Sequence, residues 1–158
     1  MTPSEFNPSG LTTATEPAPE PGVSHVEAIQ TVIASLDQYD EAFVNHTQEG
    51  YIWTFRYGSV KVFIQLTGTT DDDTFTVWSP VLTLPVAHEA ALLRQLLELN
   101  WLSTAEAQFA LLNQQVVVVS SRGVADLSAG EITRLITVVA SVADEYDELL
   151  QTQYPAGS

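Results

Sequence analysis

The sequence contains no cysteine, and this absence excludes several kinds of site. Disulfide frameworks, thiolate nucleophiles and zinc sites built on sulfur all require cysteine. Long hydrophobic runs are also missing, since no apolar stretch approaches the roughly 20 residues that span a bilayer. The first residues lack the basic flank and apolar core of a secretory signal. We therefore expect a cytoplasmic protein without a membrane segment.

Basic residues are scarce, since five lysines and arginines face 20 acidic residues, for a formal net charge of −15. The five basic residues are scattered along the chain: Arg56, Lys61, Arg94, Arg122 and Arg134. Nucleic acids and anionic membranes bind by neutralising negative charge, so we expect neither as a partner. The acidity favours solubility and neutral or basic protein partners.

The distribution of proline divides the chain into three parts. Residues 1–22 hold five of the eight prolines and few large apolar side chains, which predicts a disordered Pro-rich tail. Residues 23–151 carry the periodic hydrophobic patterns and have enough length for one domain with a real core. Residues 152–158 are predicted to form a flexible C-terminal tail.

The hydrophobic periodicity predicts three helices and five strands. Helices are expected from Ser24, from about residue 86 to 99, and from Ser128, where Ser24 and Ser128 each open a capping-box pattern. Strands are expected at residues 51–57, 60–66, 74–84, 107–112 and 116–120, with residues 43–50 as a connector. The order α-β-β-β-α-β-β-α predicts the α+β class, with helices packed on an antiparallel sheet.

Several local strings resemble the YbjN family, whose fold is grouped with the type III secretion chaperone-like proteins. The strings are LLRQLLELN at residues 92–100, FAL at 109–111, the valine strand at 116–119 and DLSAGE at 126–131. The resemblance covers residues 23–151. It implies the same α-β-β-β-α-β-β-α fold, no known catalytic residues, and homodimers that bind other proteins.

A search for catalytic and metal-binding patterns gives no candidate, so we predict no catalytic residue, no cofactor and no metal site. His25, His46 and His88 lie far apart in sequence, and His88-Glu89 lacks the second histidine of a zinc-protease motif. The acidic run at residues 71–73 lacks the alternation of an EF-hand loop. Phosphate-binding glycine patterns are also missing from the sequence. The chain is therefore predicted not to be an enzyme.

The second predicted helix carries more apolar surface than one sheet contact requires. Leu93, Leu96 and Leu97 mark its expected core face, and Leu92 and Leu99 widen the apolar arc to about half the circumference. Trp101 and Leu102 extend this arc. Six residues form the predicted partner-binding set: Phe63, Trp78, Leu92, Leu99, Trp101 and Leu102.

Together these features predict a non-catalytic protein-binding module, chaperone-like or regulatory, that acts as a homodimer. Its partner protein stays unidentified. Two alternatives remain open at this point. One is a small-molecule or lipid-binding domain that uses the aromatic row at residues 51–57. The other is an enzyme with an unrecognised acid/base site among the many carboxylates.

Overall fold

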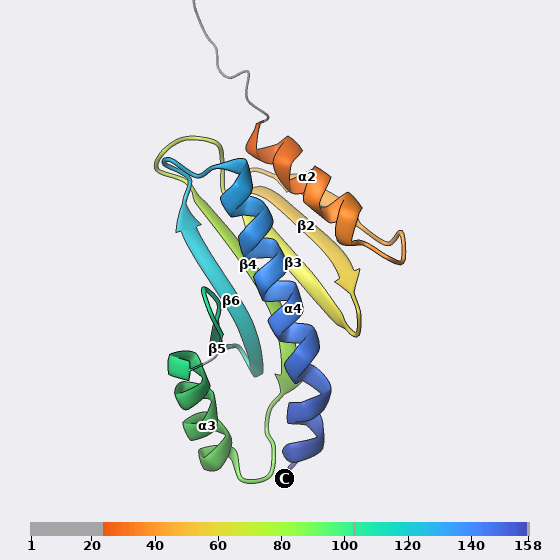
Figure 1. The fold of residues 1–158 in the computed structure, drawn as a ribbon, viewed down its shortest axis with the longest axis vertical. Coiled ribbons are helices and arrows are strands. Elements are labelled where there is room, and N and C mark those ends of the chain that lie inside the picture. Colours follow the sequence, from red (N-terminus) through yellow and green to blue (C-terminus); the bar gives the residue numbers. More distant parts are fainter. Residues whose placement is uncertain (1–23, 103, 158) are drawn as a thin grey trace, which may run out of the picture.

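The computed structural model describes residues 24–102 and 104–157. Its elements follow in the order α2 (His25–Leu36), β1 (Phe43–Thr47), β2 (Gly50–Tyr57), β3 (Val60–Leu66), β4 (Thr74–Thr83), α3 (Glu89–Leu102), β5 (Gln108–Leu112), β6 (Gln115–Gly123) and α4 (Ala129–Gln153). The strands form one antiparallel sheet in the order β1-β2-β3-β4-β6-β5 (Figure 1). The predicted α+β class is confirmed. The predicted tail at residues 1–22 lies outside the described residues.

One face of the sheet is covered by helices and holds the core. Side chains alternate along a strand, so every second residue of β3 points to the same face, and Val62, Ile64 and Leu66 on that face are buried. Helix α4 lies along this face over β3 and β4, and α2 packs beside it (Figure 1). None of the helices in the described ranges is both long and apolar enough to cross a membrane.

The segment predicted as a connector contains a strand. Residues 43–47 form β1, which pairs with β2 in antiparallel register, and a turn ends at Gly50 with a φ of 105°. All five residues of β1 are exposed, because the strand lies at the edge of the sheet. Without a buried face, the strand lacks the apolar alternation by which strands are recognised in sequence.

The C-terminal segment also differs from the expected flexible tail. Helix α4 continues to Gln153, and the buried Tyr154 follows it. The next residues pair with the segment before α3, where Ala156 forms a β-bridge with Val86 and the amide of Gly157 donates to Pro85 O at 3.2 Å. This pairing holds the chain through residue 157, and α3 begins after the paired segment, at Glu89.

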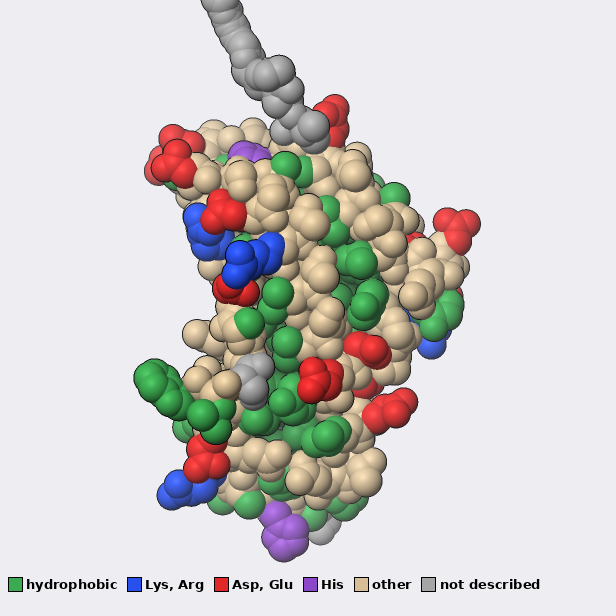
Figure 2. Space-filling model, viewed as in Figure 1, with side chains coloured by type: hydrophobic (Ala, Val, Ile, Leu, Met, Phe, Trp, Pro, Cys, Tyr) green, Lys and Arg blue, Asp and Glu red, His purple; other side chains and the backbone are tan. Residues whose placement is uncertain are grey.

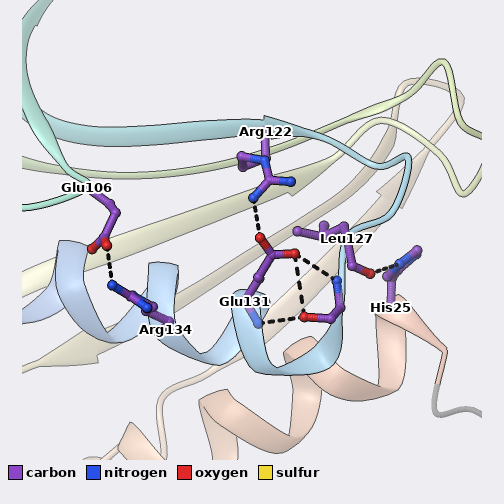
Figure 3. Close-up of polar contacts among 7 residues, drawn as sticks. His25, Glu106, Arg122, Leu127, Glu131 and Arg134 are labelled. Carbon is purple, nitrogen blue, oxygen red and sulfur yellow. Dashed lines mark hydrogen bonds and ion pairs between the residues drawn. The ribbon is translucent and has the colours of Figure 1, made fainter.

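The predicted capping box at the start of α4 is confirmed. The amide of Glu131 donates to Ser128 Oγ at 3.1 Å, and the Glu131 carboxylate accepts from the amide of Ser128 at 3.2 Å. The same carboxylate accepts from Arg122 of β6, while His25 of α2 donates from Nε2 to Leu127 O at 2.9 Å (Figure 3). These contacts join three elements at one end of the sheet.

The turn between β2 and β3 is held against α4 by two aspartates. Ser59 Oγ lies 2.8 Å from Asp147 Oδ2 and 3.1 Å from Asp144 Oδ1, which also accepts from the amide of Ser59. Asp147 is 5% exposed, and its second oxygen has no partner among the described residues. A buried carboxylate is costly without hydrogen bonds, so the position of this turn depends on Ser59.

The Ser59→Ala variant should be destabilised by about 1–3 kcal/mol, because it leaves a buried carboxylate without its donor. The free energy of unfolding, measured by urea titration, tests this expectation. Ser141→Ala is the matched control, since Ser141 is exposed on the same helix. Equal stability of the two variants would contradict the assigned role of Ser59.

The pKa of Glu131 is lowered below its ordinary value of 4.5, first by the hydrogen bond from Arg122 and then by that from the Ser128 amide. A carboxylate with a lowered folded-state pKa stabilises the fold above its unfolded-state pKa, and this contribution is lost as the pH falls through the folded-state value. We expect the wild type to lose more stability than Glu131→Gln between neutral pH and about pH 3. Urea titrations at both pH values test this, with the exposed Glu98→Gln as control. Equal losses in wild type and Glu131→Gln would contradict it.

Candidate protein-interaction surfaces

Helix α3 leaves most of its apolar side chains outside the core. Among its 14 residues only Leu92 and Leu96 are buried hydrophobic residues. Leu97 is 71% exposed, Trp101 is 88% exposed and Leu102 is 73% exposed. The helix lies beside the end of the sheet, near β5, and does not lie over the helix-covered face (Figure 1). Large apolar side chains that are exposed next to one another typically mark a site of protein interaction.

The exposed side chains of α3 continue onto the edge strand β5. Asn100 joins the two elements, since its Oδ1 accepts from the amide of Phe109 at 2.7 Å and its Nδ2 donates to Phe109 O at 3.2 Å. An apolar groove of about 290 Å³ runs between α3 and β5, with Leu97 and Leu111 among its lining residues. The α3–β5 surface consists of Leu97, Trp101, Leu102, Leu111 and Leu112, all exposed. In Figure 2, hydrophobic side chains stand out from the molecule near the end of α3.

The structure separates the predicted partner-binding residues of α3 into two groups. Trp101 and Leu102 lie on the α3–β5 surface. Leu92 is fully buried, and Leu99 is half-buried and packs against the core, so these two residues hold α3 in place. The prediction that Leu92 binds a partner is wrong, because Leu92 lies in the core. Leu97 was expected in the core, but it is exposed. When apolar residues cover half of a helix, the sequence does not indicate which side of the helix faces the sheet.

Phe63 and Trp78 lie on the sheet face opposite to α2 and α4. They are directly paired across β3 and β4, and their rings stack with centroids 5.4 Å apart. Both side chains are half-buried. We call this side of β2, β3, β4 and β6 the open sheet face. A shallow groove lined by Trp78, Leu111 and Leu112 connects it to the α3–β5 surface.

A third apolar surface lies between α2 and the edge strand β1, and no pattern in the sequence indicates it. This α2–β1 groove has a volume of about 350 Å³ and is lined in part by Ile33, Ala34, Phe43, Val44 and Trp53. Phe43 is strongly exposed, and the buried indole N–H of Trp53 has no acceptor among the described residues. The exposed strand edge offers backbone donors and acceptors to a second chain.

The histidines have separate structural environments. His25 donates to Leu127 O, His46 stacks on Tyr51 with ring centroids 3.9 Å apart, and His88 is exposed before α3. Within the described ranges, no three His, Asp or Glu side chains are grouped so that they could hold a metal ion. The arrangement of side chains favours apolar binding at the three surfaces above.

Comparison with protein families gives one match that covers most of the chain. The family model YbjN, described as "Putative bacterial sensory transduction regulator", matches residues 25–152. A search of curated protein sequences gives no match.

Several solved structures have a similar fold, and three of them are complexes of two proteins. The ExsC–ExsE complex matches with a TM-score of 0.57 and 16% identity, covering 81% of this chain and 97% of that chain. The HopA1–SchA chaperone–effector complex matches with a TM-score of 0.52 and 11% identity, covering 77% and 91%. The Yersinia pestis type III secretion chaperone SycH, in complex with a YscM2 fragment, matches with a TM-score of 0.49 and 12% identity, covering 73% and 93%. At these identities the first two matches show a shared fold.

Proposed function

The chain belongs to the YbjN family, and from this premise we propose that it is a non-catalytic protein-binding module that acts as a homodimer. A chaperone-like role is supported by the fold, because the solved structures of ExsC with ExsE and of SchA with HopA1 are complexes with protein partners. The family description favours a regulatory role as a variant of the same binding function. We place this function in the cytoplasm.

The α3–β5 surface is the observation that carries the proposal. It joins three exposed side chains of a helix to two of an adjacent edge strand, and its members are large and apolar. A twofold dimer uses the same patch on both subunits, which suits a surface that combines a protruding Trp101 with a groove beside Leu97 and Leu111. A second copy seated there would cover both the helix and the open edge of β5.

The α2–β1 groove supports a second contact, with an extended segment of another protein. A strand that pairs with β1 would extend the sheet, and its apolar side chains would reach Ile33, Phe43 and Val44. Asp37 and Asp40 also line this groove, and together with the net charge of −15 they favour a neutral or basic segment. The α2–β1 groove is therefore the proposed site for chaperone-like binding, and its ligand would be an extended segment with apolar and basic side chains.

Protein binding is preferred over the two alternatives for a structural reason. A small-molecule or lipid site between helix and sheet would use the aromatic row of β2, but Trp53 and Phe55 of that row are buried in the core. The apolar surface instead gathers on the outside of the molecule. An acid/base enzyme is favoured by no specific arrangement among the described residues.

Replacing two large side chains of the α3–β5 surface should abolish self-association. We expect the wild type to remain dimeric on dilution in size-exclusion chromatography with light scattering, and Leu97→Ser with Trp101→Ser to be monomeric, because burial of both side chains is lost. Leu149→Ser is the matched control, since Leu149 is an exposed leucine of α4. A wild type that is monomeric at every concentration would remove the homodimer from the proposal.

A positive charge in the α2–β1 groove should block binding of an extended peptide. The probe is a fluorescent peptide of alternating valine and lysine, and its anisotropy should rise with wild-type protein. Ala34→Arg should lose this binding, because the guanidinium intrudes among the groove side chains and repels the lysines of the probe. Thr31→Arg adds the same charge to the same exposed side of α2 outside the groove lining and should bind normally. Equal binding by both variants would mean that the peptide binds elsewhere.

A further inference from the structure

The open sheet face differs in charge from the rest of this acidic chain. The six strands contain no aspartate or glutamate, although the chain has 20 such residues. Lys61 is exposed on the same side of β3 as Phe63, because buried residues alternate with both, and Arg56 is its direct partner across β2 and β3. Arg122, the third basic residue in the strands, instead pairs with Glu131 of α4. The open face therefore carries two adjacent cations and no strand carboxylate.

Neither Arg56 nor Lys61 forms an ion pair within the described part of the chain, where the ion pairs involve the other three basic residues. Like charges directly opposite each other in antiparallel strands repel, so the space between them favours an anion. The exposed Arg56 stacks on the Tyr39 ring, with its guanidinium carbon 4.6 Å from the ring centroid. This stack covers one face of the planar guanidinium and orients it. The N–H groups lie in the plane, so they still point outward and can donate to a carboxylate.

An aromatic pair lies next to these cations on the same face. Phe63 follows Lys61 by two residues on β3, and its ring stacks on that of Trp78. Both rings are half-buried, so part of each ring faces solvent. Trp78 also lines the shallow groove that continues toward β5, which has a volume of about 410 Å³. A cationic contact and an apolar contact are thus about 7 Å apart along one strand, which is the rise of two residues.

We propose that the open sheet face binds an extended acidic segment of a partner protein. Side chains alternate in an extended segment, so those two residues apart point to the same face with the same spacing of about 7 Å. A glutamate of the segment would accept from Arg56 and Lys61 in charge-assisted hydrogen bonds. A large apolar side chain two positions away would cover Phe63 and Trp78. This surface goes beyond the proposed function, because its charge preference is opposite to that of the α2–β1 groove.

The net charge of −15 permits this contact, because exposed charges act over a short range. At physiological ionic strength, interactions between exposed charges more than about 8 Å apart are largely screened. The acidic residues of α4 lie with that helix on the other side of the sheet (Figure 1), and layers packed on a sheet are about 10 Å from it. A glutamate beside Arg56 would therefore interact more strongly with the two adjacent cations than with the acidic helix.

An NMR titration of the isotope-labelled full chain with unlabelled, end-capped peptides tests the proposal. The probe is Ser-Glu-Ser-Leu-Ser-Asn-Ser, and the matched peptide has glutamine in place of the glutamate. The wild type should bind the glutamate peptide about tenfold more tightly, with the largest amide shifts at Lys61, Phe63 and Trp78. Arg56→Gln with Lys61→Gln should bind both peptides equally. Arg94→Gln, which removes an exposed cation of α3, should keep the wild-type preference.

Four other outcomes would each overturn the proposal. Equal affinity of the wild type for the two peptides would mean that the cations do not select an acidic segment. Shifts centred on Phe43 and Val44 would place the peptide in the α2–β1 groove. Shifts of Phe63 and Trp78 on dilution of the protein alone would assign this face to a second copy. If neither peptide binds, the open face is not a docking site, while the homodimer and the α2–β1 groove still stand on their own tests.

Discussion

The burial of one face of the sheet is the constraint on which the rest of the structure depends. Alternation along β3 and β4 gives the helix-covered face its apolar side chains, and α4 with α2 removes that face from water. The contacts at Ser59, Glu131 and His25 then fix the helices and turns around this layer. Because two helices fill the face, α3 is left at the end of the sheet with much of its apolar surface exposed.

Much of this fold could be predicted from the sequence, because periodicity and capping are local signals. Ser24 and Ser128 begin α2 and α4 as predicted, and the strand pattern of residues 60–66 matches β3. Strand β1 was missed because an exposed edge strand has no buried side to alternate. The docking of residues 154–157 was missed because Ala156 pairs with Val86, which lies 70 residues earlier in the chain.

The candidate surfaces were predictable only in part, for a related reason. Phe63 and Trp78 could be assigned to the open face, because alternation in a strand fixes the face once its neighbours are buried. The sides of α3 could not be assigned, since Leu92 and Leu97 fit the same apolar arc and only the packed structure shows which one is buried. The α2–β1 groove is formed by side chains from two different elements, so the sequence pattern of α2 or of β1 alone does not predict it.

The order of the strands places the two proposed protein contacts at opposite edges of the sheet. Strand β5 forms one edge and β1 the other, with four strands between them. A second copy on α3 and β5 would cover the first edge and remove an exposed strand that favours unspecific pairing. The β1 edge of each subunit would remain free. A twofold assembly would therefore present two α2–β1 grooves, and one partner that filled both would gain affinity without any new kind of contact.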